Sequence, residues 1–267
     1  MKKTLTDSFD LTKKVIIITG GSGVLGSRYA EAVSLHGANV VIVDKNFETA
    51  KKLEKKIKQK YKTNPFAIKT DLTDKDSVKQ MVQKVMKKYS KIDVLVNNAA
   101  YPEGVKERTI PFEKTPLLDL EKVFQVNIAG TYICCQEVGK IMAKKKQGVI
   151  VNVSSIYGMV GADQRIYDKS SLNSTAAYAI TKAGIINFTR YLAAYWANKG
   201  IRVNTLSLGG VENGQDPNFI KNYSTKTMIG RMASKNDYID SMLFLISDAS
   251  VYMTGSNLVV DGGWTSW

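Results

Sequence analysis

The chain has 267 residues, 44% hydrophobic and 23% charged, which is typical of a globular protein that buries one sizeable core. No apolar run reaches the roughly 18–20 residues that span a bilayer. The polar start after Met1 has no apolar signal segment, so we expect a cytoplasmic protein with no membrane partner. The adjacent cysteines, Cys134 and Cys135, and the single histidine, His36, argue against a disulfide framework, a metal site and a histidine-based triad.

The net charge of +14 invites the hypothesis of a nucleic-acid partner. However, only six of the 38 basic residues are arginines, and the densest lysine run lies at 51–62. There Leu53, Ile57 and Tyr61 recur every four residues, which predicts an amphipathic helix with a solvated lysine face. We therefore expect no nucleic-acid partner. The alternative is a surface that attracts anions without sequence preference.

Apolar runs and amphipathic segments alternate along the chain. The runs predicted as strands are 15–19, 40–43, 66–70, 94–96, 149–153, 203–206 and 257–260. The segments predicted as helices are 24–36, 47–61, 74–89, 118–144, 176–198 and 235–247. Short buried strands separated by helices are typical of a parallel sheet covered on both faces. We therefore predict an α/β, doubly wound Rossmann fold with a seven-stranded, mostly parallel sheet.

Three stretches have no regular pattern: 98–116, 158–175 and 208–233. Loops at the carboxyl edge of a doubly wound sheet form its ligand site, so these stretches are the expected substrate loops. No linker, repeat or low-complexity segment divides the chain. We therefore expect a single domain over residues 1–267.

A glycine-rich sequence, TGGSGVLG at 19–26, follows the first predicted strand and opens the first helix. Gly20, Gly23 and Gly26 permit a tight turn and a close approach of backbone N–H groups to a pyrophosphate at the helix N-terminus. The next strand ends in Asp44, whose carboxylate would accept hydrogen bonds from ribose hydroxyls and repel a 2′-phosphate. This arrangement favours NAD over NADP, while Lys45 next to Asp44 would tolerate the phosphate.

Tyr178 and Lys182 are four residues apart in a predicted helix, so they share one face about one turn apart. A free phenol has a pKa of about 10, and a nearby ammonium lowers it by stabilising the phenolate. The pair is a candidate general acid/base. Because the same spacing also arises by chance, the residues around the pair decide its meaning.

Motifs along nearly the whole chain resemble those of the short-chain dehydrogenase/reductase family. Besides the glycine turn and the Tyr178/Lys182 pair, they are Asp71 after the third strand, NNAA at 97–100, VNI at 126–128, SS at 154–155, RVN at 202–204, TG at 254–255 and VDGG at 260–263. This resemblance implies the Rossmann fold and an oxidoreductase.

By this resemblance, the catalytic residues are Asn127, Ser155, Tyr178 and Lys182. Ser155 would hydrogen-bond the substrate oxygen, and Asn127 would position a water in a proton relay to Lys182. Lys182 would also bind the nicotinamide ribose. The expected proton donor and acceptor is Tyr178.

The resemblance also implies a cofactor site. Asp71 and the Leu72 backbone would hold the adenine, Asn97 would steady the strand edge, and residues 209–211 would meet the carboxamide. The residues expected to bind the cofactor are Gly20, Ser22, Gly23, Val24, Leu25, Asp44, Asp71, Leu72, Asn98, Ala99, Tyr178, Lys182, Gly209 and Val211.

The chain departs from the family pattern in three places. Its glycine spacing is that of the family's extended, nucleotide-sugar branch, because compact members usually have glycine where this chain has Val24. Tyr178 follows Ser155 by 23 positions, a longer gap than in compact members, and SSIYG at 154–158 resembles a motif of sugar-modifying relatives. Leu208 stands where proline is usual, which would alter loop rigidity. The short chain and its VDGG ending belong to the compact branch, so we predict a compact dehydrogenase with an inserted loop at 159–175.

The inserted loop is polar, which suits a polyhydroxylated substrate. Its polar residues include Asp163, Gln164, Arg165, Tyr167, Asp168 and Lys169. The alternative is a loop that is solvated or contacts another subunit. Tyr167 cannot replace Tyr178, because Ser171 stands four residues after it.

The expected activity is NAD(P)-dependent, reversible hydride transfer to or from a secondary alcohol carbon of a sugar, sugar phosphate or polyol, as in bacterial surface-sugar biosynthesis. The alternatives are a sugar epimerase or dehydratase that retains NAD, and a non-catalytic cofactor-binding scaffold. The family resemblance implies a homodimer or homotetramer formed through the helices near 118–144 and 176–198. We expect the apolar tail, residues 264–267, to pack on a neighbouring subunit.

Overall fold

Within the described part of the computed structural model, residues 8–170 and 172–267, seven strands form one sheet in the order β3-β2-β1-β4-β5-β6-β7. For Lys169 and Ser170 only the backbone is described. The strands are β1 (Val15–Thr19), β2 (Asn39–Asp44), β3 (Phe66–Lys69), β4 (Val94–Asn97), β5 (Gly148–Ser155), β6 (Ile201–Leu208) and β7 (Asn257–Val260). Every neighbouring pair is parallel. The predicted fold class is confirmed.

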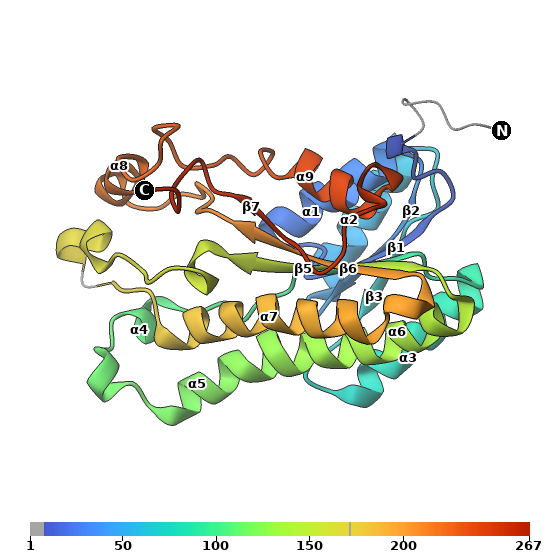
Figure 1. Cartoon of the computed structure of the whole chain (residues 1–267), viewed down its shortest axis with the longest axis horizontal. Coiled ribbons are helices and arrows are strands. Elements are labelled where there is room, and N and C mark those ends of the chain that lie inside the picture. Colours follow the sequence, from blue (N-terminus) through green and yellow to red (C-terminus); the bar gives the residue numbers. More distant parts are fainter. Residues whose placement is uncertain (1–7, 171) are drawn as a thin grey trace.

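Helices cover both faces of the sheet (Figure 1). One face carries α1 (Val24–Leu35), α2 (Phe47–Lys60) and α9 (Ile239–Ile246). The other carries α3 (Lys75–Tyr89), α6 (Thr131–Lys145) and α7 (Ala176–Tyr195). None of the helices described here is long and apolar enough to cross a membrane.

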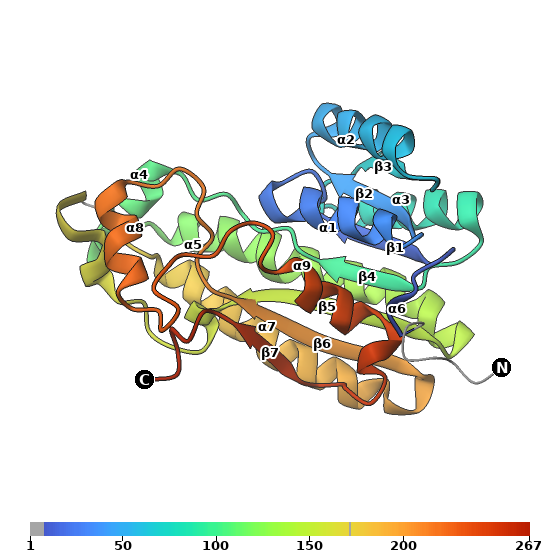
Figure 2. The same cartoon turned by 90° about the horizontal axis from the view of Figure 1, so that it is seen from above.

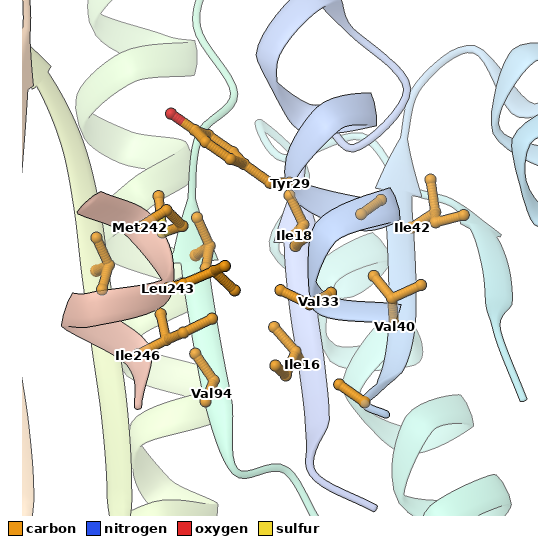
Figure 3. Close-up of a cluster of buried hydrophobic side chains, with 14 of the residues drawn as sticks. Ile16, Ile18, Tyr29, Val33, Val40, Ile42, Val94, Met242, Leu243 and Ile246 are labelled. Carbon is orange, nitrogen blue, oxygen red and sulfur yellow. The ribbon is translucent and has the colours of Figure 1, made fainter. Parts of the chain in front are cut away.

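The two cores share the central strand β1, all of whose residues are buried. Ile16 and Ile18 point to the face of α1 and α9, where they pack with Val33 and Met242 (Figure 3). Val15 and Ile17 point to the opposite core, because successive side chains of a strand alternate between faces. This alternation explains why β1 is apolar along its whole length.

The predicted helix at 118–144 is divided into three segments. They are α5 (Leu117–Phe124), a π-helical turn (Gln125–Gly130) and α6. A π turn contains one extra residue per hydrogen-bonded turn and leaves no mark on the hydrophobic pattern, and such turns often occur at functional sites. Asn127 lies inside it, fully buried.

Two short helices lie in stretches that we expected to be irregular: α4 (Val105–Arg108) and α8 (Pro217–Ser224). The start of α8 is encoded locally, because Asp216 caps the N–H groups of Asn218 and Phe219 and Pro217 occupies the first turn. The predicted helix at 235–247 begins only at Ile239. The shorter 3-10 segments are Phe112–Lys114, Ile156–Gly158, Gln164–Ser170, Ala197–Lys199 and Asp248–Ser250.

The carboxyl ends of the strands all lie at one end of the molecule, because every pair is parallel. The segments that extend beyond this end are α4, α8 and the 3-10 segment Gln164–Ser170 (Figure 2). They come from the three stretches predicted as substrate loops. The fold therefore brings these stretches together over one edge of the sheet.

Candidate active site

The turn between β1 and α1 is packed too closely for side chains. Gly20 adopts a φ of +59°, and a Cβ on Gly26 would lie 2.1 Å from the carbonyl oxygen of Gly20. Gly23 caps α1 without any side-chain hydrogen bond, so the first N–H groups of the helix remain available to an anion. The glycine spacing therefore has a steric cause, and it creates the kind of cradle that a pyrophosphate requires.

Asp44 ends β2 beside this turn and is held in place by its neighbours. Its Oδ2 accepts hydrogen bonds from the backbone N–H and the hydroxyl of Ser22, at 3.1 and 2.7 Å. Its Oδ1 accepts from the Asn46 N–H at 3.0 Å. The carboxylate is thus fixed at the rim of the glycine turn, where a ribose would lie.

Lys45 does not approach Asp44 but forms an ion pair with Asp71, with 2.9 Å between Nζ and Oδ2. Hydrogen bonds from Thr73, followed by the Lys45 ammonium, lower the pKa of Asp71 to about 2. The ammonium of Lys45 is therefore directed toward Asp71 rather than toward Asp44.

A groove of about 670 Å³ runs over these residues. The predicted cofactor residues that line it are Gly20, Gly23, Val24, Leu25, Asp44, Asp71, Leu72, Asn98 and Ala99. Ser22 does not line the groove and acts on it through Asp44. A glycine cradle, a fixed carboxylate and this elongated groove fit the phosphates, ribose and adenine of a dinucleotide.

A second cavity of about 310 Å³ adjoins the groove, and the two share Leu25, Asn98 and Ala100. Three residues predicted as catalytic lie on its walls: Ser155, Tyr178 and Lys182. The walls also include Gly209 and Val211, which were predicted to bind the cofactor. The structure therefore brings three of the four predicted catalytic residues together beside the cofactor groove.

Tyr178 and Ser155 line the same cavity, and the Ser155 hydroxyl acts to lower the pKa of Tyr178. Lys182 is buried, donates from Nζ to the Val153 carbonyl oxygen at 3.1 Å, and lies 5.6 Å from the centre of the Tyr178 ring. Burial lowers the pKa of Lys182 to about 8. Burial also raises the pKa of Tyr178, against the opposing effect of the Ser155 hydroxyl. The expected lowering by Lys182 is therefore not seen here, because the ammonium is bonded to Val153 and desolvation of the phenolate dominates.

Asn127, the fourth predicted residue, lies deeper. Its Oδ1 accepts from the Tyr101 N–H at 2.8 Å, and its Nδ2 donates to the Thr181 hydroxyl at 3.0 Å. Both ends of the amide are engaged in holding the loop after β4 against α7. The relay to Lys182 stays a prediction, one that would use the backbone of the π turn rather than the amide.

The loop after β4 also reaches the start of α7. The Thr175 hydroxyl accepts from the Tyr178 N–H at 3.2 Å as the N-cap of α7, and it donates to the Glu103 carboxylate. Burial raises the pKa of Glu103, while the hydrogen bond from Thr175 lowers it. No pattern in the sequence linked Glu103 to Thr175.

The inserted stretch contributes one wall of the second cavity. Tyr167, in the segment Gln164–Ser170, is buried and lines the cavity together with Tyr157 and with Tyr223. On the outside, Asp163 forms ion pairs with Arg165 at 2.8 Å and with Lys226 at 3.0 Å. Ser171, in the same stretch, lies outside the described residues. None of these aromatic contacts could be read from the sequence, since they join segments far apart in it.

The structure makes the role of the glycine turn testable through Gly26→Ala. The new methyl group would force the Gly20 carbonyl to move, so we expect NAD⁺ binding to weaken about tenfold or more and stability to fall by about 1–3 kcal/mol. Calorimetric titration with NAD⁺ and thermal unfolding measure both. Gly161→Ala is the matched control, because its Cβ would meet nothing within 4 Å. Unchanged NAD⁺ affinity in Gly26→Ala would contradict the assignment of the turn.

Comparisons with known proteins agree with this geometry. A family model described as enoyl-(acyl carrier protein) reductase matches residues 22–265. A D-threitol dehydrogenase of Mycolicibacterium smegmatis is 34% identical over 263 residues, which cover 96% of this chain and 95% of the relative. The post-translational flagellin modification protein A of Campylobacter coli is 29% identical, covering 95% of this chain and 99% of the relative.

A solved short chain dehydrogenase of Leptospira borgpetersenii, with bound NAD⁺, is 36% identical with a TM-score of 0.86 and covers 99% of this chain and 97% of its own. The chain belongs to the short-chain dehydrogenase/reductase family, enzymes that use a nicotinamide cofactor to interconvert alcohol and ketone groups.

Proposed function

We propose that this enzyme transfers a hydride reversibly between NAD and the alcohol carbon of a small, neutral polyol or sugar. The observation that carries the proposal is the composition of the second cavity. Ser155, Tyr178 and Lys182 share its walls, Lys182 is the one charged residue among its described lining, and the remainder combines polar, aromatic and aliphatic groups. We further propose that the groove and the cavity work as one domain, since both lie on the same sheet.

In the oxidation direction, Tyr178 as phenolate removes the proton of the substrate hydroxyl. NAD⁺ held along Gly20, Asp44 and Asn98 of the groove would supply the hydride acceptor for the same carbon. Ser155 hydrogen-bonds the reacting oxygen and stabilises the charge that develops on it. Lys182 turns from Val153 toward the cofactor ribose and Tyr178, favours the phenolate, and passes the proton toward solvent by way of the π turn at Asn127.

The charge of the cavity argues for a neutral substrate. A phosphate group buried there would find Lys182 as its only cationic neighbour among the described lining residues, and that lysine is required by Tyr178. The similarity to a D-threitol dehydrogenase supports a polyol. The similarity to a flagellin modification protein supports a role in modifying bacterial surfaces, as expected from the SSIYG motif.

Asp44 and Lys45 support NAD rather than NADP as the cofactor. The Asp44 carboxylate is held by Ser22 at the rim of the turn, where it would repel a 2′-phosphate. Lys45, the cation that would compensate, is paired with Asp71.

The decisive experiment follows NADH formation with a panel of tetritols, pentitols, hexoses and their phosphates. We expect neutral substrates to be oxidised with NAD⁺ in preference to NADP⁺, with NADH released. Tyr178→Phe removes the proton acceptor and should lower kcat by about 10²- to 10⁴-fold while NAD⁺ still binds. Near-normal turnover by Tyr178→Phe would refute the mechanism. Conversion of a sugar without free NADH would favour an epimerase or dehydratase, and NAD⁺ binding without turnover of any compound would favour a scaffold.

Glu103 offers a second test of Tyr178. Among the groups that act on this phenol, Ser155 lowers its pKa, whereas the negative charge of Glu103 raises it. Glu103→Gln keeps a hydrogen-bond acceptor for Thr175 but removes the charge, so the pKa of Tyr178 should fall. The acid limb of the pH profile of kcat/KM for oxidation should therefore move to lower pH. Glu113→Gln, at an exposed glutamate of the same loop, is the control. A limb that stays in place or moves to higher pH would contradict this role of Tyr178.

We propose that the chain self-associates through the outer surfaces of α5 and α7. These helices pack side by side and expose large apolar side chains: Leu117, Leu118, Ile180, Tyr191 and Tyr195. Exposed apolar groups gathered on neighbouring helices are typical of an interface. Of the two tryptophans of the tail, Trp264 is buried against Tyr223 of its own chain, and Trp267 is exposed and available to a neighbouring subunit.

Sedimentation velocity tests this surface. The wild-type chain should sediment as a dimer or tetramer, and Tyr191→Lys combined with Tyr195→Lys should shift it toward the monomer, because two charges would be buried in the interface. Val251→Lys, at a similarly exposed apolar residue away from α7, is the matched control. A wild-type monomer would rule out the proposed interface.

A further inference from the structure

The inserted stretch places Tyr167 deep in the cavity wall and holds it from several sides. The ring of Tyr167 packs against Phe219 of α8, with 5.1 Å between ring centres. The Arg108 guanidinium lies 5.5 Å from the centre of the same ring. Arg108 is itself bonded to the Asn173 carbonyl oxygen at 3.3 Å. Residues from three separate loops therefore fix the position of one phenol.

Tyr157 and Tyr167 line the same cavity. Tyr157 lies two residues after Ser155, and its backbone N–H donates to the Ser155 hydroxyl at 3.3 Å. Burial, followed by the nearby phenol of Tyr167, raises the pKa of Tyr157, so its phenol stays protonated at neutral pH. A hydroxyl both donates and accepts, so two phenols on the walls of one cavity can bond a further hydroxyl.

The other walls suit a short ligand with an apolar edge and several hydroxyls. Phe219, Tyr223 and Met232 provide apolar surface, and Gln215 provides an amide. The cavity of about 310 Å³ is at the small end of the range of ligand sites and must also admit the nicotinamide. A space of this size suits a short substrate.

We propose that Tyr157 and Tyr167 form a paired-phenol subsite that binds a second hydroxyl of the substrate, away from the carbon that is oxidised. This inference rests on the proposed function and deepens it: the substrate class is a short neutral polyol, and Tyr167 is the residue that selects it. The subsite comes from the insertion between Ser155 and Tyr178, so the long gap between these residues serves substrate selection.

The test compares two matched pairs of probes, D-threitol with butan-2-ol and D-arabinitol with pentan-2-ol. Each pair has one carbon chain length and differs in its additional hydroxyls. The wild-type enzyme should prefer the polyol of each pair. Tyr167→Phe should lower kcat/KM for the polyols about tenfold or more, chiefly through KM, because a buried partner of a substrate hydroxyl is lost. Its activity on the monohydric alcohols should remain unchanged, and Tyr157→Phe should behave in the same way.

The variants keep their rings, so the packing on Phe219 is retained and unfolding temperatures should match that of the wild type. Tyr29→Phe is the matched control. It also removes a buried phenol hydroxyl, but this hydroxyl has no hydrogen-bond partner and lies in the hydrophobic core between α1 and the sheet. Equal losses on polyols and monohydric alcohols, or no loss on either, would overturn the subsite while leaving hydride transfer intact. A wild-type enzyme that reduces NAD⁺ with none of the four probes would overturn the subsite and the proposed polyol oxidation together.

Discussion

The site depends on the direct packing of the end of β5 against the buried turn of α7 that carries Lys182. The Ser154 hydroxyl donates to the backbone carbonyl of Lys182 at 2.8 Å, and the side chain of Lys182 returns to the carbonyl of Val153. Gly158 lies so close that a Cβ there would be 2.7 Å from the carbonyl carbon of Lys182. These contacts fix α7 along its axis relative to β5. Ser155 and Tyr178 can therefore meet although 23 positions separate them in the chain.

A second set of contacts aligns this junction with the cofactor groove. The loop after β4 bonds in turn to the glycine turn through Asn98, to the π turn through Tyr101, and to the cap of α7 through Glu103. A regular helix at 125–130 would rotate Asn127 away from Tyr101 and Thr181, to which its amide is bonded. The π turn is therefore needed to keep these two hydrogen bonds. The glycine turn and the start of α7 are thus tied to a single loop, and changes in this loop would affect both.

The features that the sequence predicted depend on local chemistry. The strands were visible as doubly buried apolar runs and the tight glycine turn by its spacing. Glu103 and Tyr167 carried no such signal, because their partners are brought near only by the folded sheet. The pKa of Tyr178 also departed from expectation, since helix spacing indicates that Lys182 is near but not that its ammonium bonds to Val153.

The inserted stretch separates the selection of substrate from the chemistry. Tyr167 is held by Arg108 and Phe219, which belong to loops at the rim, whereas Tyr178 and Lys182 are held by the sheet. The outer side of the insertion is attached by the ion pairs of Asp163 to Arg165 and Lys226. Exposed ion pairs contribute little to stability, so this wall can vary in sequence at small cost to the fold. Members of a family that share the same catalytic residues can therefore differ in substrate through changes in these loops. Such changes would leave the residues that carry out hydride transfer in place.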